Sequence, residues 1–167
     1  LRHGICEDRF TFQGDIRKRT VIHQAKRFAV DSKRATEVSK NSLLFYDNSY
    51  GILHTDKGLG RELLWAASML HSCGKHINIS SYHKHSWYLI RNGELLGYSQ
   101  SEHLMVATIA RYHRKSLPKK RHLSWQLLTS KDQRKIVLEM SLILRLASSI
   151  DRRPIPALKT IEIEKNI

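Results

Sequence analysis

The strongest constraint on the fold is a long apolar run near the end of the chain, "IVLEMSLILRLASSI" at 136–150. Glu139 and Arg145 interrupt the run, which is shorter than the roughly 20 residues that a membrane span requires. Ser130, with Gln133 three residues later, has the spacing of a helix N-terminal capping box. The pattern therefore predicts a long helix buried in the core of a protein domain.

The rest of the chain is predicted to form shorter helices separated by turn signals. Asp31 is expected to cap the second helix, and Ser99 with Glu102 has capping-box spacing. Asn92-Gly93 and Pro118 are expected to end helices. The predicted helices span about 15–30, 32–47, 61–71, 81–91, 99–113 and 131–150. Spacings of three and four residues turn the following side chains of the first two helices inward: Val21, Ile22, Ala25, Phe28, Ala29, Ala35, Val38, Leu43 and Phe45.

The tail "ALKTIEIEKNI" (157–167) alternates apolar and polar residues and is predicted to form one strand. The fold class is therefore all-α with a short C-terminal strand. A length of 167 residues with 41% hydrophobic residues suits one domain with a real core. Cys6 and Cys73 form no CxxC pair, which indicates two free thiols in a cytoplasmic protein. Because the chain begins with Leu1, we expect it to be part of a longer protein.

Net charge indicates the kind of partner. The chain has 29 Lys and Arg against 15 acidic residues, a formal charge of +14. This excess favours a polyanion such as nucleic acid, polyphosphate or an anionic membrane face. A run of three basic residues at 17–19 and basic pairs at 26–27 and 33–34 would extend such a site if they faced the same groove.

The stretch "RYHRKSLPKKRH" (111–122) has six Lys or Arg and no acidic residue. Arginine forks match phosphate oxygens and lysines add mobile charge. Part of the run has a plainer explanation as well, since cations stabilise a helix C-terminus and basic faces are often only solvated. The predicted phosphate-binding residues are Arg111, His113, Arg114, Lys115, Lys119, Lys120 and Arg121, with His83 and His85 lining the groove.

The tryptophans are expected to have structural roles, and the His83–His85 pair is not expected to bind zinc. Trp65, Trp87 and Trp125 are expected to be core or interface residues, because two of them lie in helical apolar patterns. His83 and His85 are two residues apart and would point to opposite sides of a helix, so they cannot easily share a zinc ion.

The segment 69–122 carries a family resemblance. It contains, in order, "LHSCG", "HKHS", "YLIRN", "LLGY" and "ARYHR", and it resembles the C-terminal helical part of the exopolyphosphatase / guanosine-pentaphosphate phosphohydrolase (Ppx/GppA) family. The segments "LRHGICEDRF" (1–10) and "LRLASSIDRRP" (144–154) are similar to the family more weakly. The resemblance implies a helical bundle of the HD-domain type that follows an actin-like catalytic domain.

By this resemblance the HD metal site is degraded. Arg34 stands in place of the early histidine, and Ser72 in place of the aspartate that would follow His71. Asp151 matches the late aspartate, and it is expected to form an ion pair with a neighbouring arginine. A fixed cation close to a divalent ion is unfavourable. We therefore expect no cofactor in this domain and name His71 and Asp151 only as weak metal-ligand candidates. The resemblance implies Mg²⁺ in the parent enzyme.

The leading hypothesis is an accessory, non-catalytic domain that binds inorganic polyphosphate or guanosine pentaphosphate and supports a homodimer. The parent would be a cytoplasmic enzyme with no membrane partner. The predicted divisions are 1–14 as the tail of a linker, 15–153 as the helical domain and 154–167 as a C-terminal extension. The alternatives are an HD-type metal-dependent phosphohydrolase acting on nucleotides or (p)ppGpp, and a sequence-independent nucleic-acid binder.

Overall fold

The computed structural model describes residues 4–150 and 162–163, with side chains from Gly14 onward. These residues form α-helices and no strand, so the all-α prediction is confirmed. The elements are α1 (Gly4–Arg27), α2 (Ser32–Asn48), α3 (Leu59–Leu70), the 3₁₀ helix η1 (Cys73–His76), α4 (Tyr82–Asn92), α5 (Gln100–Tyr112), the single turn α6 (Leu123–Gln126) and α7 (Lys131–Ile150).

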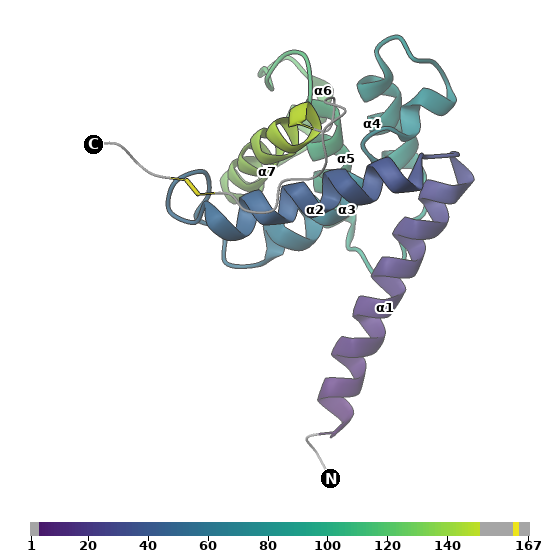
Figure 1. Cartoon of the computed structure of the whole chain (residues 1–167), viewed down its shortest axis with the longest axis vertical. Coiled ribbons are helices and arrows are strands. Elements are labelled where there is room, and N and C mark those ends of the chain that lie inside the picture. The colour runs from purple at the N-terminus through teal and green to yellow at the C-terminus, as the bar shows by residue number, and fades with distance from the viewer. Residues whose placement is uncertain (1–3, 151–161, 164–167) are drawn as a thin grey trace.

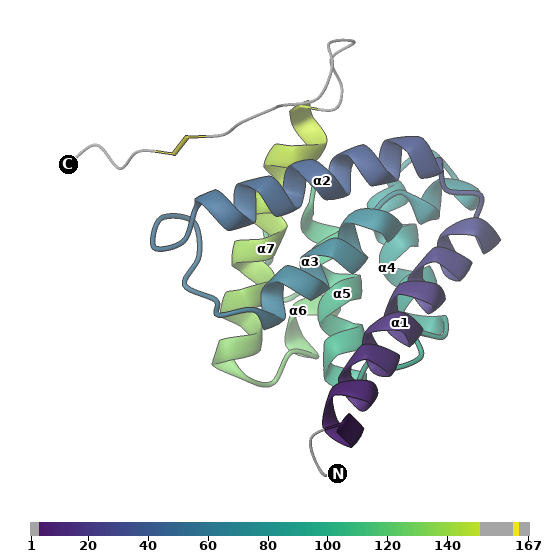
Figure 2. The same cartoon turned by 60° about the horizontal axis from the view of Figure 1, so that its bottom comes forward.

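Helices α3 and α5 lie in the middle of the domain (Figures 1 and 2). Helices α2 and α7 pack against them and against each other on one side, while α1 contacts α3 and α4 contacts α5 on the other. The N-terminal half of α1 projects away from the rest of the helices (Figure 1). The domain is therefore a bundle around two central helices, and each end of this pair can carry a distinct site.

Helix α7 has the buried role that its apolar pattern predicted. Val137, Met140, Ile143 and Leu144 are completely buried, while Leu142 stays exposed on the outer face. Burying each such side chain contributes roughly 1.5–3 kcal/mol. Trp87 lies in the same core, with Trp65 and Trp125 packed against it, so the three tryptophans are core residues as predicted.

The predicted helix caps are present. The Asp31 carboxylate accepts the backbone N–H of Arg34 at the start of α2. At α5 the Ser99 hydroxyl accepts the N–H of Glu102, and the Glu102 carboxylate accepts the N–H of Ser99. Such caps satisfy backbone donors that would otherwise have no partner.

The first helix differs from its predicted extent. It begins at Gly4 and ends at Arg27, so it crosses the predicted boundary between residues 14 and 15 without a break. Ile22 is 40% exposed, and Ala29 is exposed with a φ of 50°. Ala29 occupies the left-handed position of a Schellman-type helix end, where Val30 N–H bonds to the carbonyl of Ala25. The inward assignments of Ile22 and Ala29 were therefore wrong.

The turn after α3 packs closely against α4. The Gly74 N–H donates to the Ser86 hydroxyl, which donates in turn to the carbonyl of His71. A Cβ atom at Gly74 would lie 2.1 Å from the carbonyl oxygen of Tyr82. Only glycine fits here, and this contact sets where α4 lies. Cys73 beside it is a buried free thiol, and burial raises its pKa to about 12.

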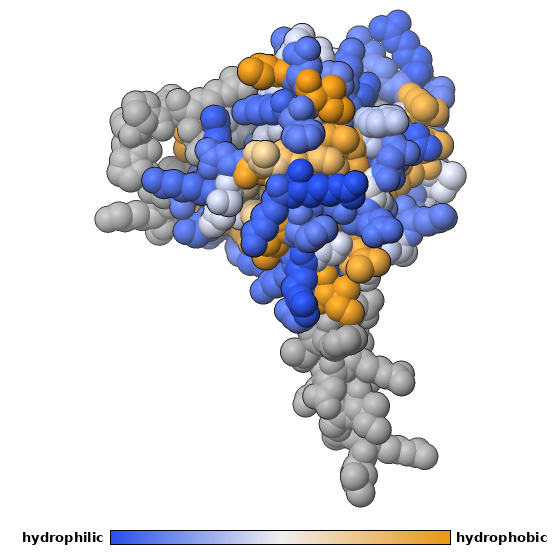
Figure 3. Space-filling view, turned by 90° about the vertical axis from the view of Figure 1, so that its right-hand side faces the viewer, coloured by the Kyte–Doolittle hydropathy of each residue, from blue (hydrophilic) through white to orange (hydrophobic). Residues whose placement is uncertain are grey.

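Two features of the surface bear on partners. Over the described residues, no helix combines the length and apolarity that crossing a bilayer needs. The face that carries α4 is mainly hydrophilic, with apolar residues scattered across it (Figure 3). The predicted C-terminal strand and Asp151 fall outside the described residues, apart from 162–163, which form no strand.

Candidate anion-binding site

Helices α3 and α5 run side by side in the same direction, which brings their C-terminal ends together. The rings of His71, just after α3, and His113, just after α5, meet edge to face with centroids 5.0 Å apart. Both are buried, and each Nδ1 donates to a backbone carbonyl of its own helix, His71 to Ser68 and His113 to Ala110. The basic stretch leaves the bundle from this buried histidine pair.

His113 forms the first anchor of what we call the basic loop, residues 114–121. Because Nδ1 of His113 donates to a carbonyl, its Nε2 is free to accept the hydroxyl of Tyr82, 3.1 Å away. Burial lowers the pKa of His113 well below its ordinary value, and the neighbouring His71 adds to this. His113, one of the predicted phosphate-binding residues, is only 2% exposed and holds the start of the loop, and its binding of phosphate stays a prediction.

A second histidine anchors the other end of the basic loop. His122 Nδ1 lies 2.9 Å from the hydroxyl of Tyr112, and the same hydroxyl lies 2.7 Å from Oγ of Ser124. The rings of Tyr112 and His122 are nearly parallel. The loop is therefore held at both ends by tyrosines of the bundle, Tyr82 on α4 and Tyr112 on α5.

The cations at the end of α5 and in the basic loop lie against aromatic rings at the base of the loop and are exposed further along it. The Arg114 guanidinium lies 4.6 Å from the ring centre of Tyr82, and Arg111 lies 5.8 Å from that of Trp87. Such cation–π contacts hold a guanidinium in place and leave its charge available. The remaining predicted cations are exposed: Lys115, Lys119, Lys120 and Arg121.

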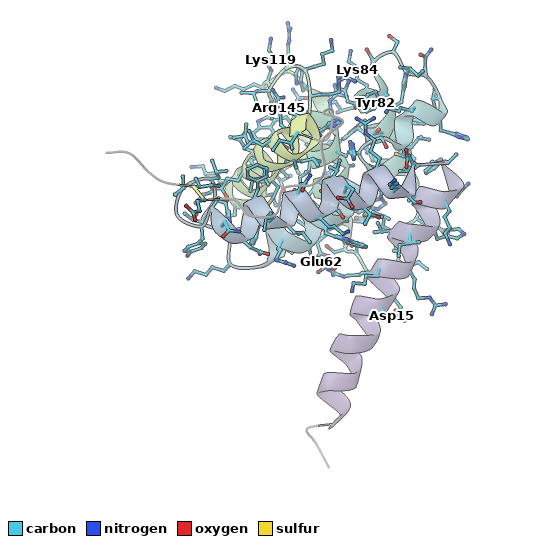
Figure 4. The ribbon with its side chains drawn as sticks, viewed as in Figure 1. Asp15, Glu62, Tyr82, Lys84, Lys119 and Arg145 are labelled. Atoms are coloured by element: carbon cyan, nitrogen blue, oxygen red, sulfur yellow. The ribbon has the colours of Figure 1, made fainter. Side chains whose placement is uncertain are left out.

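Helix α4 contributes Lys84 to these cations, beside the predicted site residues His83 and His85. His83 is 7% exposed, and its buried Nδ1 has no hydrogen-bond partner among the described residues. Burial lowers the pKa of His83 to about 4, and the positive charges of Arg114, Arg111, Lys84 and Lys115 lower it further. Lys84 and Lys119 lie at the same end of the molecule (Figure 4). Residues from α4 and from the basic loop thus form one cationic surface. His85 is half-buried on the same helix.

Within the part of the chain that the structure describes, no carboxylate balances these cations. Ion pairs join Arg17, Arg19, Lys40, Arg61 and Lys135 to acidic partners, and no ion pair among the described residues includes Lys84, Arg111 or a cation of the basic loop. Unpaired positive charge gathered on a rigid support is suited to bind an anion with several negative groups.

The three basic residues at 17–19 do not extend this surface. Arg17 bonds to Glu62 at 2.9 Å and to Glu102 at 3.0 Å, near the N-terminal ends of α3 and α5. Glu62 lies nine residues before His71 along α3, so Arg17 is separated from the histidine pair by roughly 13 Å along the helix axis. Lys18 beside it lines a separate hollow of about 620 Å³ with Trp65 and Arg61.

Two of the four residues that the resemblance assigns to a degraded metal site lie together. Arg34 and Ser72 line one pocket of about 280 Å³, together with Asp31, Lys75 and His76. Among the described residues, no three His, Cys, Asp or Glu side chains are placed to hold a metal ion. With Asp151 outside those residues, the prediction that this domain holds no cofactor stays a prediction.

Four contributors were missed from the sequence, namely Lys84, Tyr82, Tyr112 and His122. Lys84 sits between the two predicted histidines, and its outward position on α4 could have been read from helical spacing. Tyr82 and Tyr112 gave no such signal, because their roles depend on where the chain places His113 and His122.

Comparison with known proteins identifies the family of this chain. The family description "Ppx/GppA phosphatase, domain III" matches residues 16–166. The chain therefore belongs to the Ppx/GppA phosphatase family. A guanosine-5'-triphosphate,3'-diphosphate pyrophosphatase from Pseudoalteromonas translucida (strain TAC 125) is 39% identical over 124 residues. That match covers 71% of this chain and 24% of the relative, so the chain corresponds to about a quarter of that protein.

Proposed function

We propose that this chain is an accessory domain of a phosphoanhydride hydrolase and that it binds a linear phosphate polyanion. The ligand would be inorganic polyphosphate or the phosphate chain of guanosine pentaphosphate. The proposal is supported most by the cations of α4 and the basic loop, which share one surface and form no ion pair within the described residues. Family membership and the pyrophosphatase relative support the class of ligand.

The domain would take no part in bond cleavage itself. Hydrolysis would belong to an actin-like catalytic domain of the same protein, with Mg²⁺ as its cofactor, and the assembly would be a homodimer. In the accessory domain, fixed arginines would contact the phosphate oxygens while the exposed lysines track the chain. Binding of this kind releases counterions, so it gives affinity without reading a sequence and weakens as salt rises.

The test is direct titration of this chain with long-chain polyphosphate at several salt concentrations. Reversing three charges of the loop, Lys119→Glu, Lys120→Glu and Arg121→Glu, should weaken binding strongly. If each of the three cations contacts a phosphate, the slope of log affinity against log salt should fall by about 2, at roughly 0.7 per lost contact.

The matched control reverses three exposed cations at the opposite end of α3, namely Lys18→Glu, Arg19→Glu and Lys57→Glu. Both variants change the net charge equally. Equal weakening by the two variants would mean that overall charge, and not this surface, attracts the ligand. Duplex DNA that competes as well as polyphosphate at matched charge would favour the nucleic-acid alternative.

A further inference from the structure

The two ends of a short turn in the basic loop are joined by one histidine. The backbone N–H of His122 donates to the carbonyl of Lys119 at 2.9 Å, closing a turn. In the opposite direction the backbone N–H of Lys119 lies 3.2 Å from Nδ1 of the His122 side chain. Lys120 and Arg121 occupy the centre of this turn. The direction of three successive cations is therefore set by bonds to a single residue.

The ring of His122 is itself held by the core. Tyr112, on α5, is 2% exposed and bonds to His122 and to Ser124 through its hydroxyl. Its carbonyl accepts Nη2 of Arg145 from α7 at 3.0 Å. The turn is thus connected through Tyr112 to two helices of the bundle.

These bonds define the protonation state of His122. A backbone N–H can only donate, so the Nδ1 that faces Lys119 carries a lone pair and the proton sits on Nε2. The hydroxyl of Tyr112 then donates to the same Nδ1, and Ser124 donates to Tyr112. A proton on Nδ1 would point at the Lys119 N–H and remove that bond, because two donors would then face each other, whereas the Tyr112 hydroxyl could turn and accept from the ring.

The charges around His122 also favour the neutral ring. Burial lowers the pKa of His122, and nearby positive charges lower it further. They come from every element near the ring: Arg111 on α5, Arg121 and Lys119 in the turn, and Lys84 on α4. The geometry and the charges agree that the turn is assembled with an uncharged His122.

We propose that His122 is a positioning residue of the polyphosphate site: its neutral ring fixes the Lys119–Arg121 turn for binding, and its protonation releases the turn. This inference rests on the proposed function. It predicts an effect of acid opposite to simple electrostatics, because protonation of exposed histidines alone would strengthen the binding of a polyanion.

The experiment compares wild type with His122→Ala and His122→Asn in this chain. The asparagine amide oxygen can accept the Lys119 N–H but takes up no proton. The first measurement, made without ligand, is the rate of trypsin cleavage after residues 119–121. Losing the two bonds to the ring should raise this rate about 10-fold in His122→Ala, and His122→Asn should stay within about 3-fold of wild type.

The second measurement is the Kd for long-chain polyphosphate from pH 8 to pH 5. At pH 8, His122→Ala should bind about 10-fold more weakly and His122→Asn nearly as wild type does. As pH falls, wild type should lose affinity relative to His122→Asn. Thermal melts in the absence of ligand check that each variant is folded.

The possible results separate the two proposals. Unchanged trypsin cleavage in His122→Ala refutes the role of His122 in holding the turn, whatever the polyphosphate does. Faster cleavage with unchanged affinity, or parallel pH profiles for wild type and His122→Asn, shows that the turn does not position the ligand. A wild-type chain that binds no polyphosphate refutes the proposed function itself, while the cleavage assay still reports on the turn.

Discussion

Replacing Gly74 by alanine should strongly destabilise the domain. The new Cβ would lie 2.1 Å from Tyr82 O, 2.3 Å from Ser86 N and 2.8 Å from His85 C, all backbone atoms of α4 and its first turn. Backbone in a packed core cannot swing away as a long side chain can, so α4 would have to move outward by roughly 1 Å.

The cost can be built from two contributions. Overpacking of a core costs about 1–3 kcal/mol, and a rigid backbone neighbour favours the upper end. Moving α4 also stretches the two hydrogen bonds of the Ser86 hydroxyl, to Gly74 N and to His71 O, each worth about 1 kcal/mol. The sum is about 3–5 kcal/mol, a large part of the roughly 5–15 kcal/mol that stabilises a typical domain.

Urea unfolding followed by circular dichroism measures this change. Gly14→Ala is the matched control, because Gly14 lies inside α1 and a methyl group there would have no atom within 4 Å. That substitution should stabilise the protein by about 0.5–1 kcal/mol. A Gly74→Ala protein within about 1 kcal/mol of wild type would refute the claim that close backbone packing fixes α4.

Three further predictions concern charge and reactivity. The pKa of His83 is about 4 when folded and 6.5 in the unfolded chain, so only the unfolded state gains a proton between these values and stability falls with pH. In urea unfolding, the wild type should lose about 3 kcal/mol more than His83→Gln between pH 7 and pH 4, because His113 and His122 are common to both proteins; equal losses would contradict this. Arg17→Met leaves the half-buried Glu102 without its ion-pair partner and should lower the free energy of unfolding in urea by about 2 kcal/mol. Arg17→Lys should not restore the forked contacts. Arg19→Ala, which removes an exposed ion pair, should change the free energy of unfolding by less than about 0.5 kcal/mol. Cys73 should resist an excess of a thiol reagent until the protein unfolds, because the thiol is buried and its pKa is about 12. Rapid labelling of Cys73 in the native protein would show that the thiol is accessible and would contradict this prediction.

Local signals in the sequence predicted the helices well. The caps at Asp31 and Ser99 and the apolar spacing of α7 depend only on residues within a turn or two, so they could be identified without tertiary information. The end of α1 could not, because Ala29 takes a left-handed conformation that sequence patterns assign to glycine.

The charge of the candidate site could be predicted from the sequence, but the contacts that hold its loop in place could not. The run of cations at 111–122 predicts a phosphate-binding surface, since charge is visible in the sequence, and phosphate binding there stays a prediction. Charge alone did not reveal that His113 is buried or that His122 closes a turn. Those roles come from contacts between residues 10 to 31 positions apart, Tyr112 with His122 and Tyr82 with His113.

The pairs Tyr82–His113 and Tyr112–His122 hold the two ends of the basic loop. Because the ends are held in this way, a change in the loop's length should have little effect on the stability of the bundle. Among the described residues, the side-chain hydrogen bonds that hold the basic loop to the helices are made by His113 at one end and His122 at the other. The eight residues between them are the basic loop, whose length and sequence can be changed in engineered variants. Engineered variants with a longer, shorter or differently charged loop should therefore keep the core, and under the proposed function they should differ in which polyanions they bind.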